Sequence, residues 1–260
     1  MISVPKQFSG RLWLIGGTQE SVDLAKVIAQ NQLPCIISVT TESARSLYPA
    51  ASTLSVYVGR LNSAQIQQFL QQQQIVAVLD ASHPYAVEIS QNAIAATFEQ
   101  KIPYLRYERP MLEQGISLDF ETLIAGNHLQ GQRVLLTIGY TPLHRFQFWH
   151  ERATLFARIL PSVSALEAAF KAGFTPHNII CLRPPISADL EKALWRQWQI
   201  SLVVTKASGI AGGEDIKRSV ATELGIPLIA INRPIVKYPQ QTSDLSIALE
   251  FCGHQLAIKS

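Results

Sequence analysis

Short apolar runs alternate with segments of helical spacing along almost the whole chain. After the first run, a stripe of apolar residues with helical period appears at Leu24, Ala25 and Ile28. Strands without polar alternation, joined by amphipathic helices, indicate a parallel α/β fold whose sheets are buried on both faces. The runs predicted as strands are residues 12–15, 34–39, 54–58, 75–79, 102–106, 133–137, 155–159, 178–182, 202–205 and 226–231.

The alternation is interrupted in the middle of the chain. Pro110 ends regular strand pairing, and residues 111–120 show no clean period, so we interpret them as a connection. We predict two Rossmann-like parallel-sheet domains facing a central cleft, residues 1–112 binding the cofactor and residues 113–260 binding the substrate. The C-terminal segment, residues 245–258, fits either a docking helix or a loose end.

The first predicted strand leads through a glycine turn directly into a helix. Gly16 and Gly17 allow a sharp turn and a close approach to a ligand, and Thr18 suits the N-cap. Unpaired N–H groups at a helix N-terminus form a small anion site built from backbone. The dinucleotide fingerprint is not met, because Ile15 and Glu20 stand where its first and sixth positions need glycine. The turn therefore fits a cofactor loop and an ordinary strand-to-helix connection equally well.

Polar residues follow the second predicted strand. In a dinucleotide-binding unit, the end of this strand meets the adenosine ribose. Glu42 suits a ribose diol, whereas Arg45 with the hydroxyls of Thr40 and Thr41 suits a 2′-phosphate. NADH and NADPH both remain compatible with this segment, and so does a polar loop that caps a short helix.

The densest polar cluster follows the fourth predicted strand. Asp80, Ser82, His83 and Tyr85 stand within six residues, at the edge where open α/β sheets bind their ligands. The alternative is structural, with Asp80 and Ser82 capping the next helix and His83 bonded to backbone.

A second glycine-rich turn follows the run at residues 202–205. It carries Lys206, Ser208 and Gly209, with two more glycines shortly after. An ammonium group and several backbone N–H groups there suit a carboxylate or phosphate. A glycine-rich loop with a solvated lysine is the other interpretation.

Composition narrows the class of protein. The 260 residues are 47% hydrophobic and 16% charged, with a net charge of +3 and no basic block, which argues against a nucleic-acid partner. The mild positive charge suits a substrate with several carboxylates. No run has the length of a membrane span and the N-terminus lacks a signal-peptide core, so we expect no membrane partner and a cytoplasmic location.

Catalytic metal and nucleophile signatures are missing from the sequence. The histidines are dispersed and the three cysteines far apart, so we expect no bound metal and a reducing compartment. Cys35 and Cys181 stand in apolar runs and are expected to be buried. Without a nucleophile elbow or a P-loop, the glycine turns favour chemistry that a cofactor such as NADH or NADPH supplies.

Taken in order along the chain, these turns resemble the precorrin-6A reductase family of corrin biosynthesis. The residues that carry the resemblance are GGTQE at 16–20, DASHPYA at 80–86, RYERP at 106–110, LTIG at 136–139, RILP at 158–161 and TKASGIAGG at 205–213 with Lys217. The resemblance implies a two-domain α/β enzyme in which NADPH or NADH reduces one carbon–carbon double bond of a corrin-precursor macrocycle. SHPY, VGRL at 58–61 and KASGxxGG resemble the cobalt-precorrin-6A form, whereas other members carry a glycine-rich segment in place of residues 58–61 and an arginine near Glu42. This departure leaves NADH open beside NADPH, and the metal content of the substrate also stays open.

The resemblance also implies roles for individual residues. The catalytic candidates are Asp80, His83 and Tyr85. The residues expected at the cofactor are Gly16, Gly17, Thr18, Glu20, Thr40, Thr41, Arg45 and Ser82. The residues expected at the substrate are Arg106, Arg109, Lys206, Ser208 and Gly209. Two other function classes stay open: a nucleotide- or sugar-handling α/β transferase, which does not require nicotinamide binding, and a tetrapyrrole carrier, which leaves NAD(P)H unconsumed.

Overall fold

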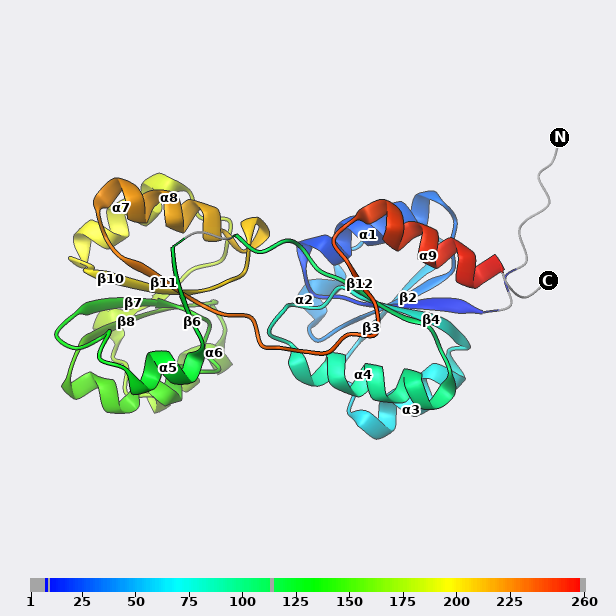
Figure 1. Cartoon of the computed structure of the whole chain (residues 1–260), viewed down its shortest axis with the longest axis horizontal. Helices are drawn as coiled ribbons and strands as arrows, with labels where there is room; N and C mark the ends of the chain where they lie inside the picture. The colour runs from blue at the N-terminus through cyan, green and yellow to red at the C-terminus, as the bar shows by residue number, and fades with distance from the viewer. Residues whose placement is uncertain (1–7, 9, 113–114, 258–260) are drawn as a thin grey trace. The chain divides into compact units, whose positions relative to one another are not determined.

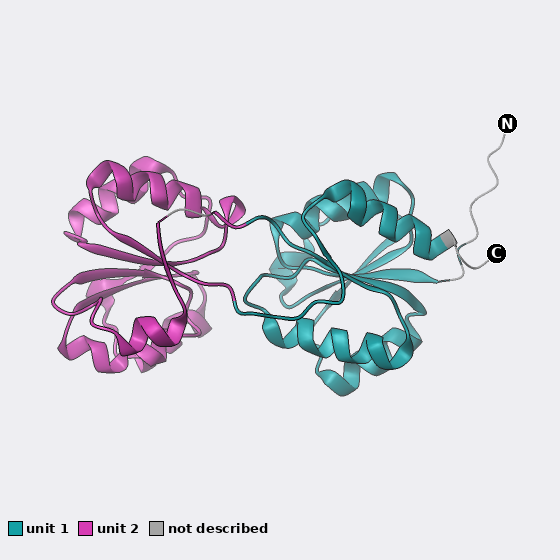
Figure 2. Cartoon of the chain, in the orientation of Figure 1, with its two compact units in different colours: residues 1–110, 234–260 teal, residues 111–233 magenta. Residues whose placement is uncertain are grey.

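The computed structural model describes residues 8, 10–112 and 115–257. The chain forms two compact units, one made of Met1–Pro110 with Pro234–Ser260 and the other of Met111–Arg233 (Figure 2). Each unit holds a six-stranded sheet with parallel strand pairs, and helices cover both of its faces (Figure 1). The predicted pair of Rossmann-like parallel sheets is confirmed, whereas the cleft between the units stays a prediction.

Unit 1 has the strand order β12-β5-β4-β1-β2-β3. Its strands are β1 (Arg11–Ile15), β2 (Cys35–Val39), β3 (Leu54–Val58), β4 (Ile75–Asp80), β5 (Tyr104–Tyr107) and β12 (Gln241–Thr242). Its helices are α1 (Gln19–Gln30), α2 (Glu42–Arg45), α3 (Ser63–Gln72), α4 (Val87–Gln100) and α9 (Leu245–Ala257). The chain builds outward from β1 through β2 to β3, then returns to the other side of β1 for β4. The neighbours β1 and β4 therefore flank the topological switch point.

Unit 2 has a similar strand arrangement, with the order β6-β11-β10-β7-β8-β9. Its strands are β6 (Ile116–Leu118), β7 (Arg133–Thr137), β8 (Thr154–Ile159), β9 (Ile179–Cys181), β10 (Leu202–Lys206) and β11 (Leu228–Ile231). Its helices are α5 (Phe120–Ala125), α6 (Val163–Lys171), α7 (Ala188–Gln197) and α8 (Glu214–Leu224), with 3₁₀ turns at Leu143–Glu151, Pro176–Asn178 and Ile210–Gly212. Here the switch point lies between β7 and β10.

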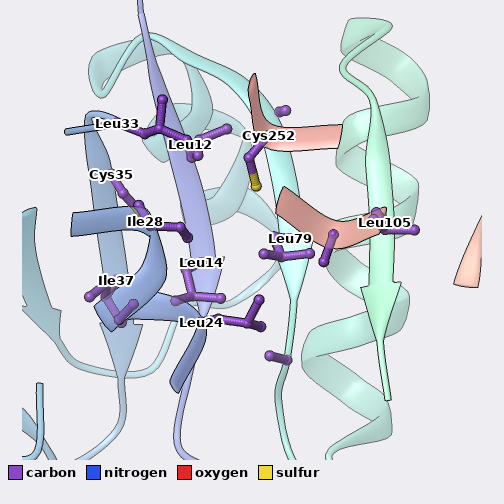
Figure 3. Packing of buried hydrophobic residues seen from close by; sticks show 14 of the residues in the cluster. Leu12, Leu14, Leu24, Ile28, Leu33, Cys35, Ile37, Leu79, Leu105 and Cys252 are labelled. Atoms are coloured by element: carbon purple, nitrogen blue, oxygen red, sulfur yellow. The ribbon is translucent and has the colours of Figure 1, made fainter. Parts of the chain in front are cut away.

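Both faces of the unit 1 sheet are buried. Alternate residues of β1 belong to separate core clusters, Leu12 and Leu14 to one and Trp13 and Ile15 to the other. Figure 3 shows the first cluster, where Leu12 and Leu14 lie near Cys252 of the C-terminal helix. This two-sided burial explains why the strand reads as an unbroken apolar run.

Two short strands were not predicted from the sequence. Strand β6 lies inside the predicted connection and pairs with β11, and β12 pairs with β5. Segments of three and two residues are too short to show a period. Residues 234–260 also differ from the expected division, since they join unit 1 although we assigned them to the second domain. The expected boundary at residue 112 lies close to the observed change of unit after Pro110.

The C-terminal helix α9 packs on the unit 1 core. Ala248, Cys252 and Leu256 are buried in the cluster that contains Leu12 and Leu14, so the docking-helix alternative holds for the described residues up to 257. No helix in the described ranges is long and apolar enough to cross a membrane. The expectation of burial is correct for Cys35 and wrong for Cys181, which is exposed because the short strand β9 forms a sheet edge.

We expect Leu256→Ala to lower the free energy of unfolding by roughly 2–4 kcal/mol, because it removes a core side chain and leaves a cavity. Leu256 is 5% exposed, whereas Ile247 on the same helix is 50% exposed. The control Ile247→Ala should change stability by less than about 0.5 kcal/mol. Urea titrations of both variants measure the difference, and equal losses would contradict the packing of α9.

Candidate functional site at the switch points

The switch point of unit 1 brings together two predicted motifs. Ile15 at the end of β1 is in register with Asp80 at the end of β4. Beyond the strands, the hydroxyl of Thr18 donates a hydrogen bond to the carbonyl of Ala81 at 2.7 Å. The glycine turn and the polar turn after β4 are thus tied side by side, at the edge where open α/β sheets bind ligands.

The backbone N–H groups of the glycine turn are used inside the protein. Gly16 donates to the carbonyl of Ser38 at 2.9 Å, and Gly17 donates to the hydroxyl of Tyr48 at 2.9 Å. These two amides are therefore not available to an anion, and the predicted site depends on the N–H groups of the helix N-terminus. Tyr48 was missed because nothing in the local pattern links it to a turn 31 residues earlier.

The first turn of α1 retains donors that suit an anion. Thr18 is the N-cap, as predicted, and its hydroxyl accepts from the N–H of Ser21 at 3.1 Å. The N–H groups of Gln19 and Glu20 have no hydrogen-bond acceptor within the described part of the chain. Donors at this end of a 12-residue helix also benefit from the helix dipole.

Different structural constraints explain the two glycines of the turn. Gly17 has φ +104°, and a Cβ built on it meets no atom of the described residues within 4 Å, so its backbone faces open space among them. A Cβ on Gly16 would lie 2.3 Å from the hydroxyl oxygen of Tyr48. Gly17 therefore allows a ligand to approach, while Gly16 accommodates the protein's own side chain.

Asp80 is a buried anchor of the turn after β4. Its Oδ1 accepts from Arg106 and from the N–H of Ser82, each at 2.9 Å. Its Oδ2 accepts from Ser90 at 2.6 Å and Tyr104 at 2.5 Å. Burial and the neighbouring Asp80 carboxylate raise the pKa of Tyr104. With 0% exposure, the carboxylate holds its neighbours in place and has no surface for a ligand.

Arg106 is equally buried and completes this network. Its Nε donates to Glu108 at 2.8 Å, and its Nη1 reaches both Asp80 and the hydroxyl of Ser82. Its guanidinium also lies over the ring of Tyr238, 5.2 Å from the centroid. Burial lowers the pKa of Arg106, but Asp80 and Glu108 more than offset this and raise it above the ordinary value. The charge is thus engaged inside the protein, not presented at the surface as expected of a substrate contact.

His83 and Tyr85 lie next to each other on the turn that this network supports. The N–H of Tyr85 donates to Nδ1 of His83 at 3.3 Å, and the two ring centroids are 5.6 Å apart. Because Nδ1 accepts this bond, the neutral imidazole carries its proton on Nε2. Both side chains are half-buried, so they reach the surface from a rigid base.

Glu20 and Arg109, predicted for cofactor and substrate respectively, form an ion pair. Both side chains are largely buried, and they stand beside the switch point in a small pocket. The pocket is lined by Thr18, Glu20, Ala81, Ser82, Pro84, Arg106, Tyr107, Glu108 and Arg109. The arginine offsets the negative charge that Glu20 would otherwise present to a phosphate at the N-terminus of α1.

The residues expected at the ribose lie on one exposed segment after β2. Thr40 and Thr41 are exposed, and Glu42 pairs with Arg45 at 3.2 Å across the short helix α2. Arg45 also donates to the carbonyl of Val56 at 3.3 Å.

In unit 2, backbone N–H groups of the glycine-rich turn after β10 also bond to groups within the protein. Gly209 donates its N–H to Glu214 at 2.7 Å, and Ser208 donates to the carbonyl of Lys206 at 2.7 Å. Glu214 is fully buried and is also bound by Arg218 at 2.6 Å. The expected convergence of N–H groups on a ligand is therefore wrong for these two amides. Burial lowers the pKa of the Lys206 ammonium.

A lysine of α8 that contacts this turn was not among the predicted site residues. Lys217 is 4% exposed and donates to the carbonyls of Gly212 at 3.0 Å and Gly213 at 2.8 Å. Burial, together with the nearby charge of Arg158, lowers its pKa to about 8. Its spacing of four residues after Gly213, on the face of α8 that also buries Val220, is the signal that could have placed it here.

Asp80→Ala should lower the free energy of unfolding by about 3–5 kcal/mol, because it leaves Arg106 buried without its main partner. A matched control is Asp23→Ala, which breaks a half-exposed pair with Lys26 and should cost less than about 1 kcal/mol. Denaturant titration of the two variants provides the test. Similar small losses in both would show that the buried network does not hold the unit together.

Comparisons with known proteins agree on one family. The family model described as precorrin-6x reductase CbiJ/CobK matches residues 11–253. The cobalt-precorrin-6A reductase of Synechocystis sp. is 46% identical over 252 residues, covering 94% of this chain and 97% of that protein. The precorrin-6A reductase of Rhodococcus erythropolis is 29% identical, with coverages of 90% and 93%. The solved structure of CobK precorrin-6A reductase matches with TM-score 0.77 and 25% identity over 95% of this chain and 97% of that one. The chain therefore belongs to the precorrin-6x reductase CbiJ/CobK family.

Proposed function

We propose that this protein is a precorrin-6A reductase that uses NADPH or NADH to reduce one carbon–carbon double bond of a corrin precursor, giving precorrin-6B or its cobalt form. The observation that carries the proposal is the meeting of GGTQE and DASHPYA at the unit 1 switch point, tied by the bond from Thr18 to Ala81. The 46% identical relative is named a cobalt-precorrin-6A reductase, so cobalt-precorrin-6A is the first substrate to test.

The residues at the unit 1 switch point fit a nicotinamide dinucleotide. The open face of Gly17 and the N–H groups of Gln19 and Glu20 offer a place for its diphosphate. The Arg109 partner of Glu20 reduces the repulsion between that carboxylate and a phosphate. When bound, the cofactor supplies the hydride, and the protein supplies orientation, shielding and a proton.

We assign proton delivery to the His83–Tyr85 pair. Reduction by hydride leaves negative charge on the conjugated macrocycle, so an acid must protonate the adjacent carbon. Nε2–H of His83 and the hydroxyl of Tyr85 are both suited to donate, and the buried Asp80 network below them fixes their turn. Asp80 thus acts in this proposal as a positioning residue, since its carboxylate is not exposed.

We place the substrate macrocycle against the turn that follows β10 in unit 2. Lys206 is suited to a carboxylate of the macrocycle, and Ser208 and Gly209 shape the turn around it. Arg106 supports the site from inside the protein, because its charge is held by Asp80 and Glu108. The unpaired cysteines suit a reducing cytoplasm.

The experiment that tests the proposal is an anaerobic assay of purified protein. The protein is titrated with NADPH and NADH, then mixed with cobalt-precorrin-6A or metal-free precorrin-6A while nicotinamide absorbance and the corrinoid spectrum are followed. Oxidation of the cofactor together with a corrinoid shift supports the reductase. Binding of cofactor and macrocycle without oxidation would contradict it and favour a carrier.

Variants of the turn after β4 identify the donor. We expect Tyr85→Phe or His83→Gln to lower kcat about 100-fold or more, whichever removes the acid. The Kd for the cofactor serves as the control and should stay within about twofold, because the fold of the turn rests on Asp80. Unchanged kcat in both variants would overturn the assignment and leave water as the proton source.

We further propose that the segment after β2 favours NADPH, because Arg45 and the Thr40 and Thr41 hydroxyls suit a 2′-phosphate. Arg45→Gln should raise the KM for NADPH about 10-fold, the equivalent of one charge-assisted contact, and leave NADH nearly unchanged. Glu42→Gln breaks the same ion pair from the other side and should not weaken NADPH binding. Equal effects of Arg45→Gln on both cofactors would contradict the proposal.

A further inference from the structure

Tyr48 joins the segment after α2 to the glycine turn. Its side chain is 8% exposed and belongs to the core cluster that also contains Ile37 and Val39 of β2. From this buried position its hydroxyl reaches the turn between β1 and α1. The ring is therefore a fixed part of the core, and the hydroxyl is held at one place relative to the turn.

The donors in this contact follow from the partners of each hydroxyl group. Gly17 donates its N–H to the Tyr48 hydroxyl at 2.9 Å, and Ser21 donates its hydroxyl hydrogen to the carbonyl of Thr18 at 2.6 Å. The 2.7 Å bond between the hydroxyls of Tyr48 and Ser21 therefore has Tyr48 as its donor. The result is a continuous chain of hydrogen bonds from Gly17 through Tyr48 and Ser21 to Thr18.

Gly16 adds a steric condition to the same contact. A Cβ at this position would stand 2.3 Å from the Tyr48 hydroxyl oxygen, 3.1 Å from its Cζ and 3.2 Å from Cγ2 of Ile37. Removing only the oxygen would thus change an impossible contact into a tight one. Gly16 and Tyr48 are a matched pair, and the first glycine of the turn is explained by the tyrosine.

We propose that Tyr48 is a positioning residue for the nicotinamide cofactor. By taking the N–H of Gly17, its hydroxyl fixes the turn so that the open face of Gly17 and the N–H groups of Gln19 and Glu20 receive the diphosphate. The inference rests on the proposed function. In this proposal the N–H of Gly17 binds the Tyr48 hydroxyl and is therefore not available to the cofactor. Because Tyr48 follows α2 closely, one chain segment shapes both the ribose end and the diphosphate end of the site.

The first test measures cofactor binding by Tyr48→Phe, which keeps the ring and removes the hydroxyl. The variant loses the hydrogen bonds of this hydroxyl to Gly17 and Ser21. This loss should raise the Kd for NADPH and NADH about 5- to 10-fold, while kcat at saturating cofactor stays within about twofold. The matched control is Tyr57→Phe, whose ring packs on Phe69 in the cluster on the opposite face of the sheet and should leave Kd unchanged. An unchanged Kd in Tyr48→Phe would overturn the inference.

The second test is a double-mutant cycle with Gly16→Ala. In the wild-type background we expect Gly16→Ala to lower Tm and to raise the cofactor Kd more than 10-fold, because the added methyl meets the Tyr48 hydroxyl. In the Tyr48→Phe background the same substitution should cause a clearly smaller further loss in both quantities. Additive effects would show that Tyr48 and Gly16 are independent and would contradict the proposed pair.

The two hypotheses fail in different ways. Wild-type protein that binds neither NADPH nor NADH would contradict the proposed function itself. Wild-type protein that binds a cofactor, with Tyr48→Phe binding it equally well, contradicts only the role of Tyr48. For Tyr48→Phe, measurement of Tm alongside Kd separates a general loss of folding from a local change in the turn, since positioning predicts a rise in Kd for this variant even at temperatures far below its Tm.

Discussion

The buried carboxylate of Asp80 is the interaction on which the candidate site of unit 1 depends. It joins the end of β4 to Arg106 and Tyr104 of β5, to Ser90 of α4 and to the backbone of its own turn. A charge buried to this extent is tolerated only when its hydrogen-bonding capacity is filled, and here both oxygens are. The turn carrying His83 and Tyr85 therefore rests on a base that cannot shift without exposing an unpaired charge.

Unit 2 also contains buried carboxylates that hold neighbouring elements together, formed by different residues. Glu214 receives Arg218 and the N–H of Gly209, and Glu191 of α7 receives Arg158 at 2.5 Å and the indole of Trp195 at 2.9 Å. Each carboxylate is buried and links a helix to another element of the unit. In both units the turns at the switch point are thus held by internal carboxylates and backbone acceptors, which leaves few backbone donors for a ligand.

The sequence was sufficient for the regular parts of the fold and for the position of the polar turns along it. Strands that are buried on both faces show as continuous apolar runs, and the turns GGTQE and DASHPYA follow such runs, so their place at the sheet edge could be predicted. The partners of the polar groups could not. The bond from Gly17 to Tyr48 and the pair Glu20–Arg109 join positions far apart in the sequence. Burial of Asp80 and Arg106 could not be predicted either, because a cluster of polar residues looks the same whether it faces a ligand or the core.

The chain passes from unit 1 into unit 2 after Pro110 and returns after Arg233. Unit 2 is therefore one continuous stretch of sequence, whereas unit 1 lacks β12 and α9 until the last part of the chain is available. During synthesis on the ribosome, which proceeds from the N-terminus, the second unit can be completed while the first still exposes the apolar surface that α9 covers. Until β12 and α9 have been synthesised, the first unit therefore lacks an edge strand of its sheet and a helix of its core.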